Sequence, residues 1–291
     1  MQKFIISTDS GCDLSAEECK KRGIETLLMS YAIDDTVYHD TMEVSALGKF
    51  YADMENGAVP KTGSVSIGES LEHFEKLAER GLPIIHLTLG SGISGTYSNA
   101  LQAKDLLLAK HPEVELHIVD TTLASTGYGL LAIEAAEMRD KGLSAEECVA
   151  VLESEKWRVE PFYTTGDLKY LYRGGRVSRG GMIIAHALGI QPILDLSYEG
   201  KLRVCGKVRG QKQTWNRIAE IIKERSISPE TQTLYISHSN APELAHQFAE
   251  NIMSVVPFKD VFYTYIGTII GAHTGPGLVA AFFKGKVRDE E

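Results

Sequence analysis

The first half of the chain alternates short apolar runs with segments whose apolar residues recur at helical spacing. The apolar runs predict strands over residues 3–8, 24–33, 82–89 and 114–119. Helical spacing predicts helices over residues 67–80, 97–110 and 129–139. Strands that alternate with helices are typical of a mostly parallel sheet with helices on its faces. The first half is therefore expected to be an α/β unit.

The pattern changes after the capping-box sequence Ser144–Glu147, which predicts a helix reaching about residue 157. Two strand-like runs flank Tyr198-Glu199-Gly200 and predict an antiparallel hairpin over 191–197 and 201–208. Beyond it we expect helices at 211–225 and 241–253, a strand at 231–237 and a final strand at 261–266. The prediction is a two-domain α/β protein, with an α/β domain over 1–160 and an α+β domain over 161–291.

Composition narrows the class of partner. The 291 residues are 43% hydrophobic and 24% charged, and the net charge of −9 disfavours nucleic acid as a ligand. No apolar run is long enough to predict a transmembrane helix, and the N-terminal run turns polar by Asp9. We therefore expect a cytoplasmic protein without a signal peptide. The four cysteines form no C-x-x-C pair and the nine histidines no H-x-x-x-H pattern, so no metal site is expected.

Gly90-Ser91-Gly92-Ile93-Ser94-Gly95-Thr96 is the segment with the clearest chemistry. It is a glycine- and hydroxyl-rich turn between the strand at 82–89 and the helix at 97–110. Free backbone N–H groups and the helix dipole attract anions to such a helix start. Asp9 and Asp120 follow neighbouring strands, and ligands of parallel sheets bind at that edge. The sequence therefore predicts an anion site at this turn.

The same turn has three other interpretations. Gly90-x-Gly92-x-x-Gly95, followed by Asp120, matches a dinucleotide fingerprint and would suit a nucleotide-dependent oxidoreductase. Ser94 with His273 as its base would suit a serine hydrolase, although Thr96 replaces the last glycine of the nucleophile elbow. The glycines are also consistent with close packing of a helix start, without any ligand.

Three further clusters carry polar or basic groups. Residues 61–66 place hydroxyl groups directly before a helix, which is typical of a helix cap. His273 lies in a segment rich in glycine and proline, which suits either an exposed loop or an orienting role. The stretch from Arg173 to Arg179, which Arg209 could extend, is either a solvated loop or a docking patch for phosphate or an acidic partner.

Five motifs in order make the chain resemble the DegV family, the fatty-acid-binding proteins that serve bacterial fatty acid kinase. The resemblance runs nearly end to end, and the common order makes it specific although each motif alone is weak. The motifs are Asp9-Ser10-Gly11-Cys12-Asp13-Leu14, Ser91-Gly92-Ile93-Ser94-Gly95-Thr96-Tyr97, Asp120-Thr121 with Ser125 and Gly127, Leu168-Lys169-Tyr170-Leu171-Tyr172-Arg173-Gly174-Gly175-Arg176, and Gly271-Ala272-His273-Thr274-Gly275-Pro276-Gly277.

The resemblance implies a carrier with a lipid tunnel between two domains and with no cofactor. It implies that Thr62, Ser94 and the backbone at Gly95 hold the carboxylate of a long-chain fatty acid, with His273 supporting them. Apolar segments such as 27–29 and 130–131 are candidates for the tunnel lining. The family often has T-S-Q-P-S where this chain has Thr62-Gly63-Ser64-Val65-Ser66, so the wall beside Thr62 differs.

The resemblance also implies a protein partner. This partner is a separate ATP-dependent kinase subunit, which converts the bound carboxylate to an acyl phosphate. Arg173, Arg176 and Arg209 would then face the kinase or its phosphates. We expect no nucleic acid partner and at most transient contact with a membrane.

Overall fold

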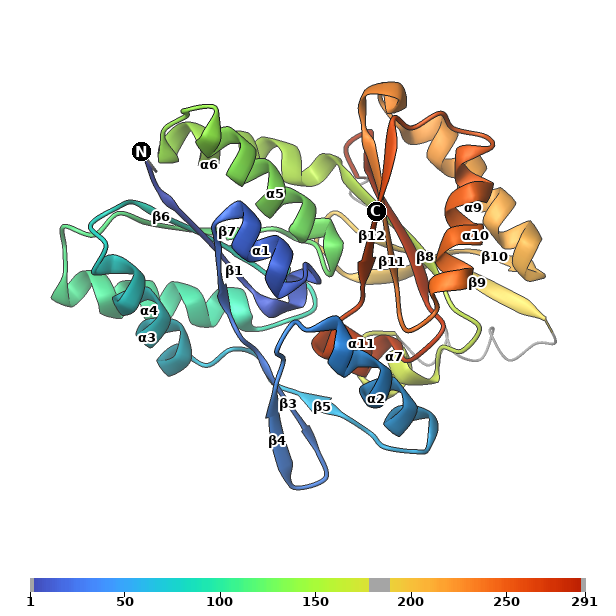
Figure 1. The fold of residues 1–291 in the computed structure, drawn as a ribbon, viewed down its shortest axis with the longest axis horizontal. Helices are drawn as coiled ribbons and strands as arrows, with labels where there is room; N and C mark the ends of the chain where they lie inside the picture. Colours follow the sequence, from blue (N-terminus) through green and yellow to red (C-terminus); the bar gives the residue numbers. More distant parts are fainter. Residues whose placement is uncertain (1–2, 178–188, 289–291) are drawn as a thin grey trace.

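The computed structural model describes residues 3–177 and 189–288 and is layered around two large sheets (Figure 1). The first sheet is parallel, as predicted, and has the order β2-β1-β6-β7. Its strands are β1 (Ile5–Asp9), β2 (Ile24–Leu27), β6 (Ile84–Thr88) and β7 (Leu116–Asp120). The parallel order places Asp9, the Gly90 turn and Asp120 at one edge of the sheet.

The second sheet is mixed and has the order β10-β9-β8-β13-β11-β12. Its strands are β8 (Val159–Thr164), β9 (Ile190–Leu196), β10 (Leu202–Arg209), β11 (Thr233–His238), β12 (Asp260–Tyr265) and β13 (Val279–Lys284). The predicted β9–β10 hairpin is confirmed, and so is the α/β fold class. The expectation that the strand near 261–266 is the last one is wrong, because β13 follows and inserts between β8 and β11.

The helices form layers on and between the sheets (Figure 1). Two helices, α3 (Ile67–Ala78) and α4 (Thr96–Lys110), pack on the outer face of the parallel sheet. Two others, α9 (Gln211–Arg225) and α10 (Pro242–Met253), pack on the mixed sheet. The helix α5 (Thr126–Asp140) is buried on nearly all sides because it contacts both sheets, and α1 (Ala16–Arg22) and α6 (Ala145–Glu155) lie alongside.

A small third sheet corrects one expectation. The chain does not continue as one strand over 24–33: it leaves the parallel sheet after Leu27, and a second strand begins at Ser30. Met29 lies at the break, with its N–H donated to Ser10 Oγ at 3.1 Å and its side chain buried. The small sheet has the order β4-β3-β5, comprising β3 (Ser30–Ile33), β4 (Thr36–His39) and β5 (Lys61–Thr62).

Three short or medium helices pack together beside the small sheet. These helices are α2 (Val44–Glu55), α7 (Lys169–Arg173) and α11 (Thr268–Thr274). α11 contacts β3, β5, α2 and α7, and its burial brings residues near 62, 170 and 273 together. Tyr51 of α2 donates its hydroxyl to the carbonyl of Ile266 at 2.7 Å, directly before α11.

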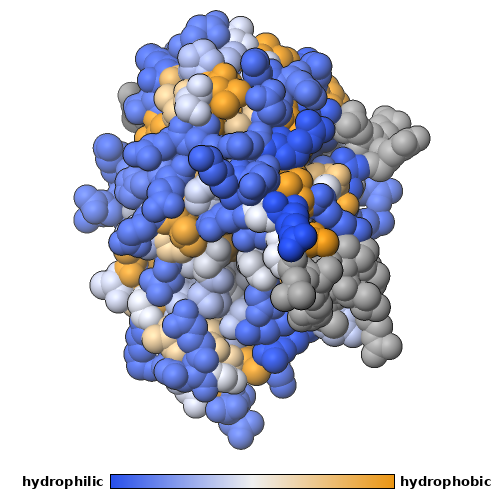
Figure 2. Space-filling view, turned by 90° about the vertical axis from the view of Figure 1, so that its right-hand side faces the viewer, coloured by the Kyte–Doolittle hydropathy of each residue, from blue (hydrophilic) through white to orange (hydrophobic). Residues whose placement is uncertain are grey.

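On the face in Figure 2, hydrophobic residues occur in small groups among hydrophilic ones. Among the described residues, no helix has both the length and the apolar composition needed to span a bilayer. The parallel sheet ends before residue 160 and the mixed sheet starts at Val159, but α5 packs against both, so the division at 160 stays a prediction.

Candidate functional site

The Gly90–Thr96 turn joins β6 to α4 as predicted and presents a serine hydroxyl. Ser94 Oγ accepts the N–H of Thr96 at 3.2 Å and lies 2.9 Å from Thr96 Oγ1. Thr96 Oγ1 itself accepts the N–H of Val65 at 3.3 Å. Each hydroxyl oxygen accepts one backbone N–H, so either hydroxyl can donate within the Ser94–Thr96 pair. When Thr96 donates, the Ser94 hydroxyl hydrogen is left for a ligand.

The glycines of this turn are explained by close packing. A Cβ at Gly92 would lie 2.3 Å from the carbonyl oxygen of Glu199, in the β9–β10 turn. A Cβ at Gly90 would lie 2.8 Å from the backbone nitrogen of Leu123. Asp120 accepts both the N–H of Ser91 at 3.0 Å and its hydroxyl at 2.5 Å. Both the glycines and the acid of the dinucleotide fingerprint are thus used within the fold, so the oxidoreductase interpretation gains no support.

Thr62 and His273 form the second polar group of the site. Thr62 ends β5, His273 lies in the last turn of α11, and Thr62 Oγ1 is 2.7 Å from His273 Nε2. Nδ1 of His273 is buried without a hydrogen-bond partner among the described residues, and a Cβ at Gly174 would lie 2.2 Å from it. A buried N–H without an acceptor costs more than a bare ring nitrogen, so we place the proton on Nε2.

This tautomer sets the direction of the hydrogen bond. His273 Nε2–H donates to Thr62 Oγ1, and the Thr62 hydroxyl hydrogen is left for a ligand. Burial, and then the charge of Arg176, lowers the pKa of His273 to about 4. The serine hydrolase interpretation gains no support, because the hydrogen bond of Nε2 is made with Thr62.

The titration of His273 gives a pH prediction. Its pKa in the folded protein lies below the ordinary value near 6.5, so its contribution to stability is complete above pH ~6.5 and is lost as the pH falls toward 4. We expect nitrogen NMR to report a neutral ring protonated at Nε2 from pH 8 down to pH ~5. A ring that titrates near pH 6.5 would contradict the assignment.

An apolar cavity brings the predicted carboxylate residues together. Thr62, Ser94 and His273 all line it, and Gly95 lies next to Ser94. Its apolar walls come from both halves of the chain: Met29, Leu89, Ile93, Ala124, Leu171, Leu202, Ile269 and Ile270. Of the expected lining segments, 27–29 contributes Met29, whereas Leu130 and Leu131 are buried in the core around α5. We call this space the inner cavity.

The inner cavity is small, and one predicted donor is already engaged. Its volume is about 70 Å³, below the roughly 300 Å³ at which ligand pockets usually begin. The N–H of Gly95 donates to Ser64 Oγ at 3.1 Å, so a ligand would have to displace Ser64 to use it. Ser64 belongs to the segment that departs from the family pattern.

A basic cavity adjoins the inner cavity at the Thr62–His273 pair. This outer cavity has a volume of about 230 Å³ and is lined by Lys61, Arg173 and Arg176, with no acidic side chain among its described lining. Arg176 also lines the inner cavity and donates to the carbonyl of Ile93 at 3.1 Å and 3.3 Å. Arg209 ends β10 and lines neither cavity, and Arg179 lies outside the described residues.

Two contributors were not predicted from the sequence. Lys61 faces the outer cavity, although its segment is typical of a helix cap. Arg288 is 3% exposed and donates to the carbonyls of Thr122 at 3.1 Å and Ser197 at 3.0 Å. It fastens the β9–β10 turn, which packs on Gly92, to the loop after β7. The polar C-terminal sequence gives no signal of this burial.

Gly174 provides a test of how the site is supported. Gly174→Ala places a methyl group against the His273 ring, so α7 and α11 must separate. We expect ligand affinity to fall about tenfold, because the hydrogen bond from His273 that holds Thr62 is lost. The matched control is Gly166→Ala, since nothing lies within 4 Å of that position. Unchanged affinity in Gly174→Ala, measured by titration, would contradict this role.

Comparison with known proteins decides the family. The family model described as "Uncharacterised protein, DegV family" matches residues 3–286. This chain belongs to the DegV family. A DegV domain-containing protein of Clostridium perfringens is 36% identical over 290 residues, which cover 99% of this chain and 100% of the relative. A DegV domain-containing protein of Lactococcus lactis is 34% identical over 281 residues, covering 96% of each chain.

Solved DegV structures share the fold over nearly the whole length. A fatty acid binding DegV family protein from Streptococcus agalactiae has a TM-score of 0.84 at 28% identity, covering 98% of this chain and 100% of that one. DegV from Bacillus subtilis, described as a fatty acid binding protein, has a TM-score of 0.82 at 26% identity, with coverages of 98% and 100%. The layered arrangement around the site is therefore the DegV arrangement.

Proposed function

We propose that this protein binds a long-chain fatty acid and presents its carboxylate to a separate ATP-dependent kinase subunit. The observation that carries the proposal is that Thr62 and His273 lie where the apolar inner cavity meets the basic outer cavity, with Ser94 lining the inner cavity beside them. An amphiphile with one anionic group matches that boundary. The fatty acids bound by related DegV proteins support the same ligand class.

The two ends of the ligand have different requirements. Burying the tail gives about 0.8 kcal/mol per methylene, or on the order of 12 kcal/mol for roughly 16 carbons before ordering costs. The carboxylate must be hydrogen-bonded when it is buried. The free hydroxyl hydrogens of Thr62 and Ser94 supply two charge-assisted donors. Because the inner cavity holds about 70 Å³, its walls must separate as the tail enters.

The outer cavity suits the phosphoryl transfer. The kinase would transfer the γ-phosphoryl group of ATP to a carboxylate oxygen, and ADP would leave. The positive side chains of Lys61, Arg173 and Arg176 would lie on the side from which the phosphate approaches. Arg209, farther along β10, would contact the kinase. In this proposal the protein is a carrier subunit without a catalytic nucleophile or a cofactor of its own.

Native mass spectrometry of the protein purified from cells tests the ligand class. We expect one fatty acid per chain, identified after denaturing extraction. A bound nucleotide would contradict the proposal. The kinase role is tested separately, by incubating the loaded protein with a fatty acid kinase subunit and ATP and measuring acyl phosphate. Lipid binding without acyl phosphate would refute the kinase role alone.

A further inference from the structure

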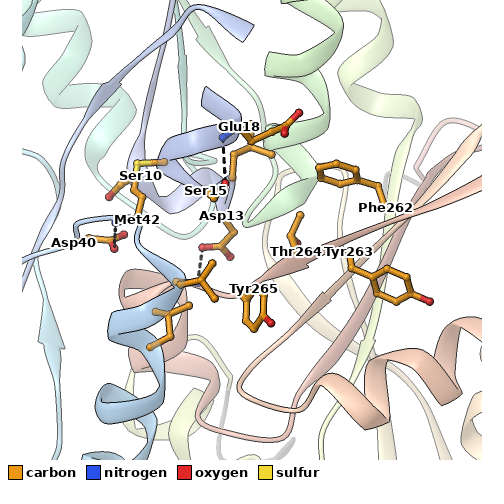
Figure 3. Close-up of a pocket in the computed structure, with 14 residues that line it drawn as sticks. Ser10, Asp13, Ser15, Glu18, Asp40, Met42, Phe262, Tyr263, Thr264 and Tyr265 are labelled. Atoms are coloured by element: carbon orange, nitrogen blue, oxygen red, sulfur yellow. Dashed lines mark hydrogen bonds between the residues drawn. The ribbon is translucent and has the colours of Figure 1, made fainter. Parts of the chain in front are cut away.

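A third cavity lies away from the proposed lipid site, along β12 at the edge of the mixed sheet (Figure 3). It has a volume of about 240 Å³ and is bounded by the residues after β1, the start of α2 and β12. Three acidic residues line it, Asp13, Glu18 and Asp40, and no lysine, arginine or histidine does so among the described residues. We call this space the edge cavity. Thr62, Ser94 and His273 are not part of it.

The carboxyl groups of Asp13 and Asp40 are deeply buried. Asp13 is 5% exposed; its Oδ1 accepts the N–H of Gly267 at 2.8 Å, and its Oδ2 accepts the hydroxyl of Ser125. Glu18 differs, because it lies in an ion pair with Arg22 at 2.5 Å. The charge of Asp13 therefore meets neutral donors only, whereas that of Glu18 is balanced.

Asp40 is the group with unused hydrogen-bonding capacity. It is 2% exposed, and its Oδ1 accepts the N–H of Met42 at 3.2 Å. Its Oδ2 is buried and makes no hydrogen bond of ordinary geometry within the described part of the chain, although the hydroxyl groups of Ser10 and Thr268 lie near this carboxyl group. Burial raises the pKa of both Asp13 and Asp40, and those two hydroxyl groups offset part of the rise at Asp40. A buried carboxylate without a partner is costly unless a positive charge or a donor meets it.

The opposite wall of the edge cavity is aromatic. Figure 3 shows Asp40 and Ser10 on one side, the aromatic residues of β12 on the other, and Asp13 between them. Phe262 is partly buried, and Tyr265 is 37% exposed at the cavity mouth. Aromatic faces attract organic cations. Among the described residues, no three histidine, cysteine or acidic side chains are placed so that they could hold one metal ion, so the lining favours an organic cation.

We propose that the edge cavity binds a small organic ammonium ion. Its N–H groups donate to Asp40 Oδ2 and face Asp13, and its carbon atoms lie against Phe262 and Tyr265. The volume of about 240 Å³ limits the ligand to a few heavy atoms, such as the end of an alkylamine or a polyamine. The ammonium ion supplies a positive charge beside both buried carboxyl groups and a hydrogen-bond donor for Asp40 Oδ2.

Isothermal titration with n-butylammonium chloride tests the proposal, with sodium chloride of equal ionic strength and choline chloride as comparison titrants. We expect saturable binding of one n-butylammonium per chain, and at least tenfold weaker binding of choline, which has no N–H donor. Absence of saturation, or equal affinity for choline, would overturn the assignment.

Three variants separate this site from general charge effects. Asp40→Asn should weaken n-butylammonium binding at least tenfold, and Tyr265→Ala should weaken it severalfold without disturbing a buried carboxyl group. Asp260→Asn is the matched control, because Asp260 is an exposed acid of the same strand outside the cavity and should bind as the wild type. Wild-type affinity in Tyr265→Ala and in a folded Asp40→Asn would overturn the proposal.

Discussion

Replacing Ser94 by alanine is expected to weaken fatty acid binding about 10- to 100-fold. The substitution removes one of the two hydroxyl donors available to the carboxylate, and a hydrogen bond to a charged group contributes about 1.5–3 kcal/mol. Thr62→Val should have an effect of similar size, because it removes the donor held by His273. Affinity would be measured by titration with a fluorescent fatty acid.

A neighbouring serine provides the control for this prediction. Ser91 lies in the same turn, but its hydroxyl binds Asp120 and it lines neither the inner nor the outer cavity. Ser91→Ala should therefore keep wild-type affinity. If Ser94→Ala and Thr62→Val also bound fatty acid as the wild type does, the proposed carboxylate site would be wrong.

Arg288→Met is expected to lower the free energy of unfolding by about 1–3 kcal/mol. The substitution leaves the buried carbonyl of Thr122 without a donor among the described residues, whereas the carbonyl of Ser197 keeps the N–H of Gly200 at 2.9 Å. Relief of the arginine's own burial offsets part of the cost. That burial also lowers the pKa of Arg288 to about 10. Chemical denaturation would measure the change in the free energy of unfolding.

Lys286→Met tests whether the effect is specific to the buried guanidinium. Lys286 is exposed, so this substitution should change the free energy of unfolding by less than about 0.5 kcal/mol. Arg288→Met should also weaken fatty acid binding, since Ala124 and Leu202 of the inner cavity lie close to the loops that Arg288 joins. Equal stability of the two variants would refute this role.

Many elements could be predicted because their signals are local. The helix predicted over 211–225 is confirmed, and α9 matches it at both ends. The capping box at Ser144 and Glu147 is formed, and the glycine turn at 198–200 joins β9 to β10. Such features depend on neighbours within a few residues, so their physical causes are visible in the chain itself.

Other elements could not be predicted because distant contacts decide them. β5 has only two residues and exists because it pairs with β3, and α11 is a seven-residue helix in a glycine-rich segment. Short segments of this kind have weak intrinsic preferences, and tertiary packing overrides them. The same holds for β13, whose apolar run by itself does not reveal a place between two strands.

The sequence by itself determined the class of chemistry: a glycine- and hydroxyl-rich helix start, a histidine in a glycine-rich segment, and basic residues in an acidic chain. Only the tertiary structure decided that Thr62, Ser94 and His273 meet, that an apolar cavity lies on one side of Thr62 and His273 and a basic one on the other, and that Arg288 supports the surrounding loops. The reason is that the type of each side chain is a local property of the sequence. The distance between residues 62 and 273, in contrast, depends on the packing of α11 against β5.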